Sequence, residues 1–388
     1  MNPYAMRSLF CGLVLLLSLS GCSNPARLAT LEPLMSEPGW RTAQRQWVLS
    51  PAYYAQAVSG HLGVLSLAKP IDDWLADSDV SEALKDRLKR AQTMRRFAAD
   101  VLDLPDNSSY TRYADLERRA VVWNVVATPT LSLEPHKWCF PFAGCVSYRG
   151  FYQQQAAQSF ATSLPTDWDV KIYPVSAYST LGWTQWLGGD PLLNTMLAFP
   201  EMELAGLLFH ELAHQRVYAS GDTTFSESYA TAVERLGAAA WRAHRESDPD
   251  FGEVWAKHQE WLRQRKAFLA LVSRTRANLQ SVYSQATSGA GPELLQPRKA
   301  EVLLDFERQY AQLKNEWGGM ARFDVWGQSP NNAVFAIQNS YEQWVPAFEQ
   351  LHAQLGGDWR AFHGAVQELS RLPREQREIR LKALQTGR

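Results

Sequence analysis

The chain has 388 residues, with 39 Lys and Arg against 40 Asp and Glu, so its formal net charge is −1. This balance gives no basic surplus, which argues against a nucleic-acid partner. Beyond residue 22 the sequence has no run of 18 consecutive apolar residues, so no membrane-spanning helix is expected there. The length supports one domain over residues 22–388, or two subdomains at 22–290 and 291–388. The sequence leaves the oligomeric state open.

The N-terminus has the pattern of a lipoprotein signal peptide over residues 1–21. Arg7 precedes the apolar run 9–19, which is too short to span a bilayer as a permanent helix. The run ends in Leu-Ser-Gly-Cys, and small residues before a Cys are what a lipoprotein signal peptidase needs. We expect acyl chains on Cys22 to anchor the protein in a membrane. Ser23 follows instead of the Asp that retains lipoproteins in the inner membrane, so the outer membrane facing the periplasm is expected. The alternative is a plain secretory signal with a chance Cys.

Hydrophobic periodicity predicts a mainly α protein of the α+β class, with a small sheet and long C-terminal helices. Strands are expected at residues 120–133, 145–151 and 169–180. Helices are expected at residues 53–67, 80–102 (with Ser81 as its cap), 151–164, 251–283, 298–317, 340–355 and 358–384. Residues 288–297 are interpreted as a linker, and residues 318–332 as a loop.

Two cysteines remain after the signal and the anchor: Cys139 and Cys145. In an oxidising compartment they are expected to form a disulfide, since Pro141 and Gly144 between them allow a tight loop. Such a short loop stabilises by roughly 2 to 3 kcal/mol in the chain-entropy model. The alternative, a second metal site, lacks a convincing set of partner ligands.

Residues 207–215 read Leu-Leu-Phe-His-Glu-Leu-Ala-His-Gln, an H-E-x-x-H box in an apolar run. On a helix, His210 and His214 lie one turn apart on one face, where two neutral imidazoles can hold one zinc ion. Glu211 then projects beside the metal and can take a proton from the attacking water. The pattern is typical of a zinc peptidase. The alternative is two surface histidines on an ordinary helix.

A catalytic zinc ion needs a third protein ligand and keeps one open position. The extended box H-E-x-x-H-x-x-G-x-x-H is excluded, because Val217 stands where its Gly belongs and Ser220 where its third His belongs. Three acids downstream are therefore candidates: Asp222, Glu227 and Glu234.

A second helix is expected to follow, with Ser226 as its N-cap and Glu227 in its first turn. Gly221 suits the end of the first helix, and residues 220–224 read as a short loop. If the two helices run antiparallel, Glu227 swings back over the two histidines. The alternative for Glu227 is a first-turn acid favoured by the helix dipole.

Residues 225–234, Phe-Ser-Glu-Ser-Tyr-Ala-Thr-Ala-Val-Glu, resemble the N-E-G-F-A-x-x-x-E stretch of the gluzincins, zinc peptidases with two His and one Glu as ligands. The resemblance implies that Glu227 is the third zinc ligand. It also implies that Glu234 steadies a ligand histidine. The chain departs from these enzymes in two ways: the spacing from His214 to Glu227 is shorter, and their G-x-M-E-N exopeptidase motif is absent.

A wider resemblance covers most of the mature chain. Pro-Asp-Asn at 105–107, Val-Trp-Asn-Val at 122–125, the Cys-containing stretch 138–150, Ala-Tyr-Ser-Thr-Leu-Gly-Trp at 177–183 and Asn-Asn-Ala at 331–333 resemble the bacterial family of predicted aminopeptidase lipoproteins. The resemblance implies a gluzincin-like fold with a small sheet beside the zinc helix. It also implies aminopeptidase activity.

Two further parts of an active site are expected. Zinc peptidases of this class often carry an edge strand along which an extended peptide pairs, and we assign this role to residues 175–180 at the end of the 169–180 strand, with Tyr178, Ser179 and Thr180 as site residues. An ordinary sheet strand is the alternative.

The oxyanion of the tetrahedral intermediate needs a hydrogen-bond donor. The candidates are Tyr341, expected near the start of a helix, and Tyr229, with Asn331 or Asn332 assisting.

A free substrate amine would need an acid near the cleft. Glu201 and Glu203 are close in sequence, but we expect that one helical face cannot present both them and the box. The leading interpretation is a zinc-dependent peptidase of the cell envelope with Glu211 as general base, acting as an aminopeptidase on peptides or proteins. An envelope endopeptidase and a metal-bound, non-hydrolytic assembly factor or chaperone are the alternatives.

Overall fold

The computed structural model describes residues 45–386, except residues 142–143, 181–184 and 289. The predicted signal peptide over residues 1–21 and the predicted lipidation site Cys22 lie outside the described residues. Among the described residues, no helix is both long and apolar enough to cross a membrane.

The N-terminal helices begin where the sequence places their caps. Helix α1 (Pro51–Leu67) follows Ser50, whose hydroxyl accepts the backbone N–H of Tyr53. Helix α2 (Ile71–Ala76) is short, and α3 (Glu82–Asp100) begins after Ser81, whose hydroxyl accepts the N–H of Leu84 at 3.3 Å. The predicted cap Ser81 is therefore confirmed.

The described strands form three small sheets of three strands each. Their orders are β1-β5-β6 (Arg45–Trp47, Lys137–Phe140, Gly144–Val146), β2-β3-β9 (Lys69–Pro70, Arg112–Ala114, Leu192–Leu193) and β7-β4-β8 (Arg149–Phe151, Val122–Pro129, Trp168–Val175). The predicted strand at 145–151 is therefore two strands in two sheets. The sequence does not show this division, because it depends on the pairing partners: β6 pairs with its hairpin neighbour β5, whereas β7 pairs with β4.

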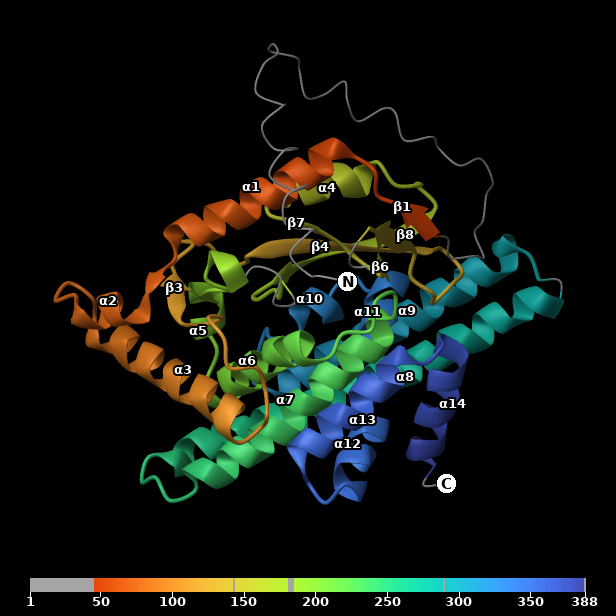
Figure 1. Ribbon diagram of the computed structural model, residues 1–388. Coiled ribbons are helices and arrows are strands. Elements are labelled where there is room, and N and C mark those ends of the chain that lie inside the picture. Colours follow the sequence, from red (N-terminus) through yellow and green to blue (C-terminus); the bar gives the residue numbers. More distant parts are fainter. Residues whose placement is uncertain (1–44, 142–143, 181–184, 289, 387–388) are drawn as a thin grey trace, which may run out of the picture.

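The β7-β4-β8 sheet is covered by a helix on each face. Val125 of β4 packs in the cluster that holds Ala157 of α4 (Gln154–Thr162), whereas its neighbour Val126 packs with Ala333 and Ile337 of α11 (Asn332–Glu342). Successive strand residues point to opposite faces, so this pair of valines sets the two layers. Helix α11 also contacts α7 (Thr223–Arg245), so it lies between the sheet and α7 (Figure 1).

The remaining elements are helical. They are η2 (Gln185–Leu187), α5 (Asn194–Leu197), α6 (Glu201–Arg216), α8 (Phe251–Ser284), η3 (Gln285–Ser288), α9 (Pro292–Glu316), α10 (Asp324–Gly327), α12 (Val345–Gln354), α13 (Trp359–Arg371) and α14 (Arg374–Gln385). Helices α8 and α9 form a long antiparallel pair beside the α6 and α7 pair (Figure 1). The main core joins α3, α6, α7, α12 and α13, and a second cluster lies between α8 and α9. The expected fold class, mainly α with small sheets, is confirmed.

Three predictions near the C-terminus are wrong. The linker at 288–297 overlaps α9, which includes Pro297 because buried Leu295 and the Lys299–Asp169 ion pair (2.6 Å) hold that turn in place. The loop at 318–332 contains α10. The single helix at 358–384 is two helices, because a residue before proline is driven out of the helical region and Leu372, before Pro373, is extended.

The predicted start of a helix at residue 340 is also wrong. Helix α11 begins at Asn332, and the Asn331 side chain accepts the N–H groups of Ala333 and Val334. The Asn332 side chain accepts the hydroxyl of Tyr283 at 2.7 Å and donates to the Thr130 carbonyl. Both asparagines therefore fix α11 to its neighbours, and neither lies among the residues around the histidine box.

Candidate metal centre

The histidine box lies on α6, and the candidate third ligand lies on α7. Helix α6 ends before Val217, which is extended, and Gly221 in the connection has a φ of +79°. Asp222 caps α7 by accepting the N–H of Phe225 at 3.1 Å. The predicted cap Ser226 is wrong: its hydroxyl instead bonds the backbone of Ala219 and closes the connection. Helix α7 therefore starts earlier than expected, which places Glu227 in its second turn.

The two helices bring three predicted ligands together. Oε2 of Glu227 lies 3.4 Å from Nε2 of His210 and 3.6 Å from Nε2 of His214. The three candidate ligand atoms all lie within 4.8 Å of one another, and all three residues are buried. In the part of the chain that the structure describes, these three side chains form a group whose spacing could hold a metal ion.

The chemistry of this group fits a divalent cation. Oε2 of Glu227 is buried and faces the Nε2 atoms of the two imidazoles, and a buried carboxylate is costly unless a positive charge lies next to it. Two imidazoles and one carboxylate are also the ligand set that zinc accepts in catalytic sites. The residues present therefore fit a divalent cation.

Glu234 lies behind the first histidine. Its Oε2 is 3.3 Å from Nδ1 of His210, so the two ring nitrogens of this histidine face two different carboxylates. Glu227 and Glu234 are seven residues apart, which places them on one face of α7. Asp222, the other candidate acid, pairs with Arg377 at 2.6 Å and does not reach the histidines' cluster.

Contacts within the cluster shift the pKa values of His210 and Glu227 in opposite directions. Burial lowers the pKa of His210, but hydrogen bonds to Glu227 and Glu234 outweigh it and raise the pKa to about 10. Burial raises the pKa of Glu227, but the charge of His214 and the hydrogen bonds of both histidines bring it down to about 2. A cation bound by these atoms would therefore compete with protons for the same ligand atoms.

Glu211 is buried beside the cluster, with 8% of its surface exposed. Burial raises the pKa of its carboxyl, and the charges of His210 and His214 oppose this rise. A raised pKa suits a carboxylate that accepts and returns a proton near neutral pH.

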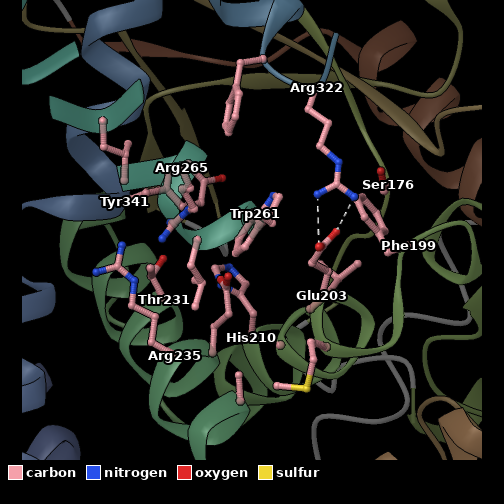
Figure 2. Close-up of a pocket in the computed structure, with 18 of the residues that line it drawn as sticks. Ser176, Phe199, Glu203, His210, Thr231, Arg235, Trp261, Arg265, Arg322 and Tyr341 are labelled. Atoms are coloured by element: carbon pink, nitrogen blue, oxygen red, sulfur yellow. Dashed lines mark hydrogen bonds and ion pairs between the residues drawn. The ribbon is translucent and has the colours of Figure 1, made fainter. Parts of the chain in front are cut away.

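A cavity of about 660 Å³ opens beside His210 and Glu211. Its walls come from α6, α7 and α8, from the end of β8, from the segment around Arg322 and from the end of α11 (Figure 2). We expected that one face of α6 could not present Glu201 and Glu203 together with the histidine box. Glu203 does line the cavity together with His210, so for Glu203 this expectation is wrong. The two residues are seven apart and so share a face, whereas Glu201 points elsewhere and pairs with Arg90 and Arg245.

Tyr341 reaches the cluster, although from a helix end and not from a helix start. It lies in the last turn of α11, lines the cavity and stacks on the ring of His210 at 6.2 Å between centroids. The other candidate donor, Tyr229, is fully buried in the core, where its hydroxyl lies 2.9 Å from Nδ1 of His363. Tyr229 therefore packs in the core and does not line the cavity.

The predicted substrate strand ends too early. Strand β8 stops at Val175, so Tyr178, Ser179 and Thr180 are not in a strand. The chain turns away because the Tyr178 hydroxyl bonds Nδ1 of His61 at 2.7 Å and the Thr180 N–H donates to Asp190 at 3.0 Å. Residues 173–177 line the cavity, so the first half of the predicted segment 175–180 reaches it and the second half does not. Strand β8 is nevertheless at the edge of its sheet.

The predicted disulfide between Cys139 and Cys145 is present and joins β5 to β6. The same hairpin abuts the connection between the two metal-site helices. A Cβ on Gly144, which has a φ of +75°, would lie 2.6 Å from Oγ of Ser220 and 2.7 Å from the backbone nitrogen of Gly221. The disulfide hairpin therefore supports the α6–α7 connection, a role that the sequence did not indicate.

The fold and this cluster define a mainly helical protein with a buried His-His-Glu group at the wall of a cavity. Residues 52–381 match the family described as "Putative aminopeptidase", so the chain belongs to this family. The family name supports peptidase activity in general and names no metal. Searches of curated proteins and of solved structures found no match.

Proposed function

We propose that this protein is a zinc-dependent metallopeptidase, and that its family's aminopeptidase name describes its activity. The observation that carries the proposal is the convergence of His210, His214 and Glu227 beside Glu211 at the wall of an open cavity. A buried carboxylate oxygen that faces two imidazoles, with a further acid nearby, is an arrangement typical of metal-dependent hydrolysis.

Each side chain has a definite task in this proposal. When bound, zinc would polarise the peptide carbonyl and make the attacking water more acidic. Glu211 accepts the proton of that water and returns it to the leaving amine. Glu234 accepts the Nδ1–H of His210, which keeps the Nε2 lone pair directed at the ligand cluster. Tyr341 donates its hydroxyl to the oxyanion that develops on the substrate.

An endopeptidase is the second candidate, and one observation favours it. An aminopeptidase needs a carboxylate that is available to the substrate amine. Apart from Glu211, the proposed base, the cavity carboxylates already have partners: Glu203 is 3.1 Å from Arg322, Glu342 is 2.6 Å from Arg235, and Glu234 is 3.3 Å from His210. An amine would have to displace one of these partners.

We also propose that the protein works in the cell envelope, attached through a lipidated Cys22 to the outer membrane and facing the periplasm. The supporting observations are the Leu-Ser-Gly-Cys sequence and the Cys139–Cys145 disulfide, since structural disulfides persist in oxidising compartments.

Elemental analysis together with turnover of a peptide mixture tests the proposal. Purified protein should carry about one zinc per chain, which His210→Ala should lose. Glu211→Gln should keep the zinc and lose at least about 100-fold in kcat, whereas exposed Glu253→Gln should match the wild type. Full activity in zinc-free protein would refute the mechanism.

The same assay covers the remaining parts of the proposal. Fragment masses distinguish removal of N-terminal residues from internal cutting. Tyr341→Phe should keep zinc and lower kcat by roughly 100-fold or more, as expected for an oxyanion donor. An unchanged kcat in this variant would assign Tyr341 to packing alone.

A further inference from the structure

The cavity beside the metal cluster has a mainly apolar wall. Its Phe and Trp side chains come from just before α6, from α8 and from the segment around α10: Phe199, Trp255, Trp261, Phe268, Phe323 and Trp326. Leu207 of α6 and Ala238 of α7 complete the apolar surface next to His210. Trp261 lies between the Arg322 side and the Arg235 side of the cavity, facing His210 (Figure 2).

Several charged side chains of the cavity form ion pairs with one another. Arg322 bonds Glu203 at 3.1 Å, and Arg235 and Arg265 share Glu342 at 2.6 Å and 2.9 Å. These pairs use the arginines and carboxylates that would otherwise recognise a charged substrate group. A charged side chain entering the cavity would therefore lose water and have to compete with these pairs for an ionic partner.

The far wall is held in place before any ligand binds. Phe323 stacks on Phe268 with 4.6 Å between ring centroids and 17° between planes. The adjacent Arg322 crosses to Glu203 on α6 (Figure 2). This wall comes from the segment after α9, so two contacts fix its distance from the metal-site helices. A preformed apolar wall loses little entropy when a ligand binds.

The size of the cavity indicates what it holds. Its volume of about 660 Å³ is within the range of roughly 300 to 1,000 Å³ typical of ligand pockets, and it exceeds the volume of any one side chain. Resting on the proposed function, we propose that this cavity is the specificity pocket of the peptidase. It binds a large aromatic or aliphatic side chain next to the scissile bond, together with an apolar neighbouring residue, and rejects charged residues.

One residue allows the pocket to be filled without disturbing the core. Ala239 of α7 lines the cavity and is exposed, so Ala239→Phe should place a ring in the cavity. Ala243 is exposed on the same helix but does not line the cavity, so Ala243→Phe is the matched control. The two variants add the same ring to the same helix.

The first measurement is kcat/KM on peptides that differ only at the residue beside the cleavage site. Wild-type protein should prefer Phe over Ala by roughly 10- to 100-fold, and should cleave peptides with Asp or Lys there more slowly than those with Ala. Ala239→Phe should abolish the preference for Phe while retaining cleavage of the Ala peptide, and Ala243→Phe should behave as wild type. Hydrolysis without apolar preference would overturn the pocket but not the proposed function.

The second measurement does not need turnover. Binding of acetyl-Phe-Phe-amide and acetyl-Asp-Asp-amide to the Glu211→Gln variant is followed by tryptophan fluorescence, since Trp255, Trp261 and Trp326 line the cavity. The apolar peptide should bind at least about 10-fold more tightly, and adding Ala239→Phe should remove the difference. Such binding without any hydrolysis by wild-type protein would support the pocket and refute the peptidase. Equal binding of both peptides would refute the pocket.

Discussion

At the scale of single residues, two glutamates on one face of α7 face different nitrogen atoms of the histidines. Glu227 faces Nε2 of both histidines, whereas Glu234 faces only Nδ1 of His210. Glu227→Ala should weaken zinc binding by several orders of magnitude, because two protein ligands would remain. Glu234→Ala should weaken it roughly 10- to 100-fold, as for groups that orient a ligand. Competition with a chromophoric chelator measures both affinities.

The reverse order of the two effects would contradict this assignment, and Glu234 would then be the ligand. Glu253→Ala is a suitable control, because Glu253 is exposed on α8 and pairs only with Lys257 in an i,i+4 contact. Its zinc affinity should equal that of the wild type.

At the scale of elements, the N-terminus of α7 depends on one buried ion pair. Asp222 caps α7 with one carboxylate oxygen, and its other oxygen pairs with Arg377 of α14 at 2.6 Å. Arg377→Met should leave this carboxylate buried without its cation, which costs about 3 to 5 kcal/mol. Urea unfolding measures the loss. Because α7 carries Glu227, the zinc affinity of the folded variant should fall as well.

Arg374 provides the comparison for this prediction. It lies one turn away on α14 and pairs with Glu378 on a half-exposed surface at 2.9 Å. Arg374→Met should change the free energy of unfolding by less than about 1 kcal/mol. If the two variants are equally stable, the buried pair does not hold α7 in place.

The elements also show what the sequence can predict. The sequence predicts helices with a strong local signal, such as the one capped by Ser81. The three candidate ligands lie on two consecutive helices, and helical periodicity determines which face each one occupies. Helix α11 was missed because Asn331 and Asn332 are typical of a loop, although Asn331 acts as its cap. The short strands were missed because their pairing depends on distant partners.

The cavity shows the same limit at larger range. It combines residues from Tyr173 to Glu342, including α8 and the Arg322 segment, which are far from the box in sequence. No local pattern indicates that Trp261 and His210 share a wall. Likewise, the strand end at 178–180 was misplaced because the Tyr178–His61 contact spans 117 residues. Local sequence patterns predict the candidate ligands, whereas tertiary packing determines which residues line the cavity.

At the scale of the whole molecule, buried neutral histidines make stability depend on pH. Burial lowers the pKa of His363 to about 4, and its nitrogens contact the Leu102 carbonyl and the Tyr229 hydroxyl. The unfolded value is about 6.5, so the unfolded chain binds more protons between pH 6.5 and pH 4. The free energy of unfolding should therefore rise with pH in this window, and the part due to His363 is on the order of 3 kcal/mol.

Urea unfolding at several values between pH 7.5 and pH 4.5 measures this dependence. His363→Gln should be less stable at pH 7.5, because the contacts of the imidazole are altered, but should lose less stability than the wild type on acidification. Contributions from other groups cancel in the comparison of the two slopes. Parallel slopes would show that His363 is not held neutral in the folded state.

The proposed attachment to the membrane also concerns the whole molecule. The Leu-Ser-Gly-Cys sequence ends at Cys22, and each acyl methylene buried in a bilayer contributes about 0.8 kcal/mol. Mass spectrometry should therefore find a mature N-terminus at Cys22 that carries acyl chains, and Cys22→Ala should block both lipid attachment and this cleavage. An unmodified N-terminus at another residue of the wild-type protein would refute the lipoprotein interpretation. The ligand cluster lies at residues 210–227, far along the chain from the anchor. A chain that begins at Asn24 should therefore bind zinc with the affinity of the full protein, which separates attachment from chemistry.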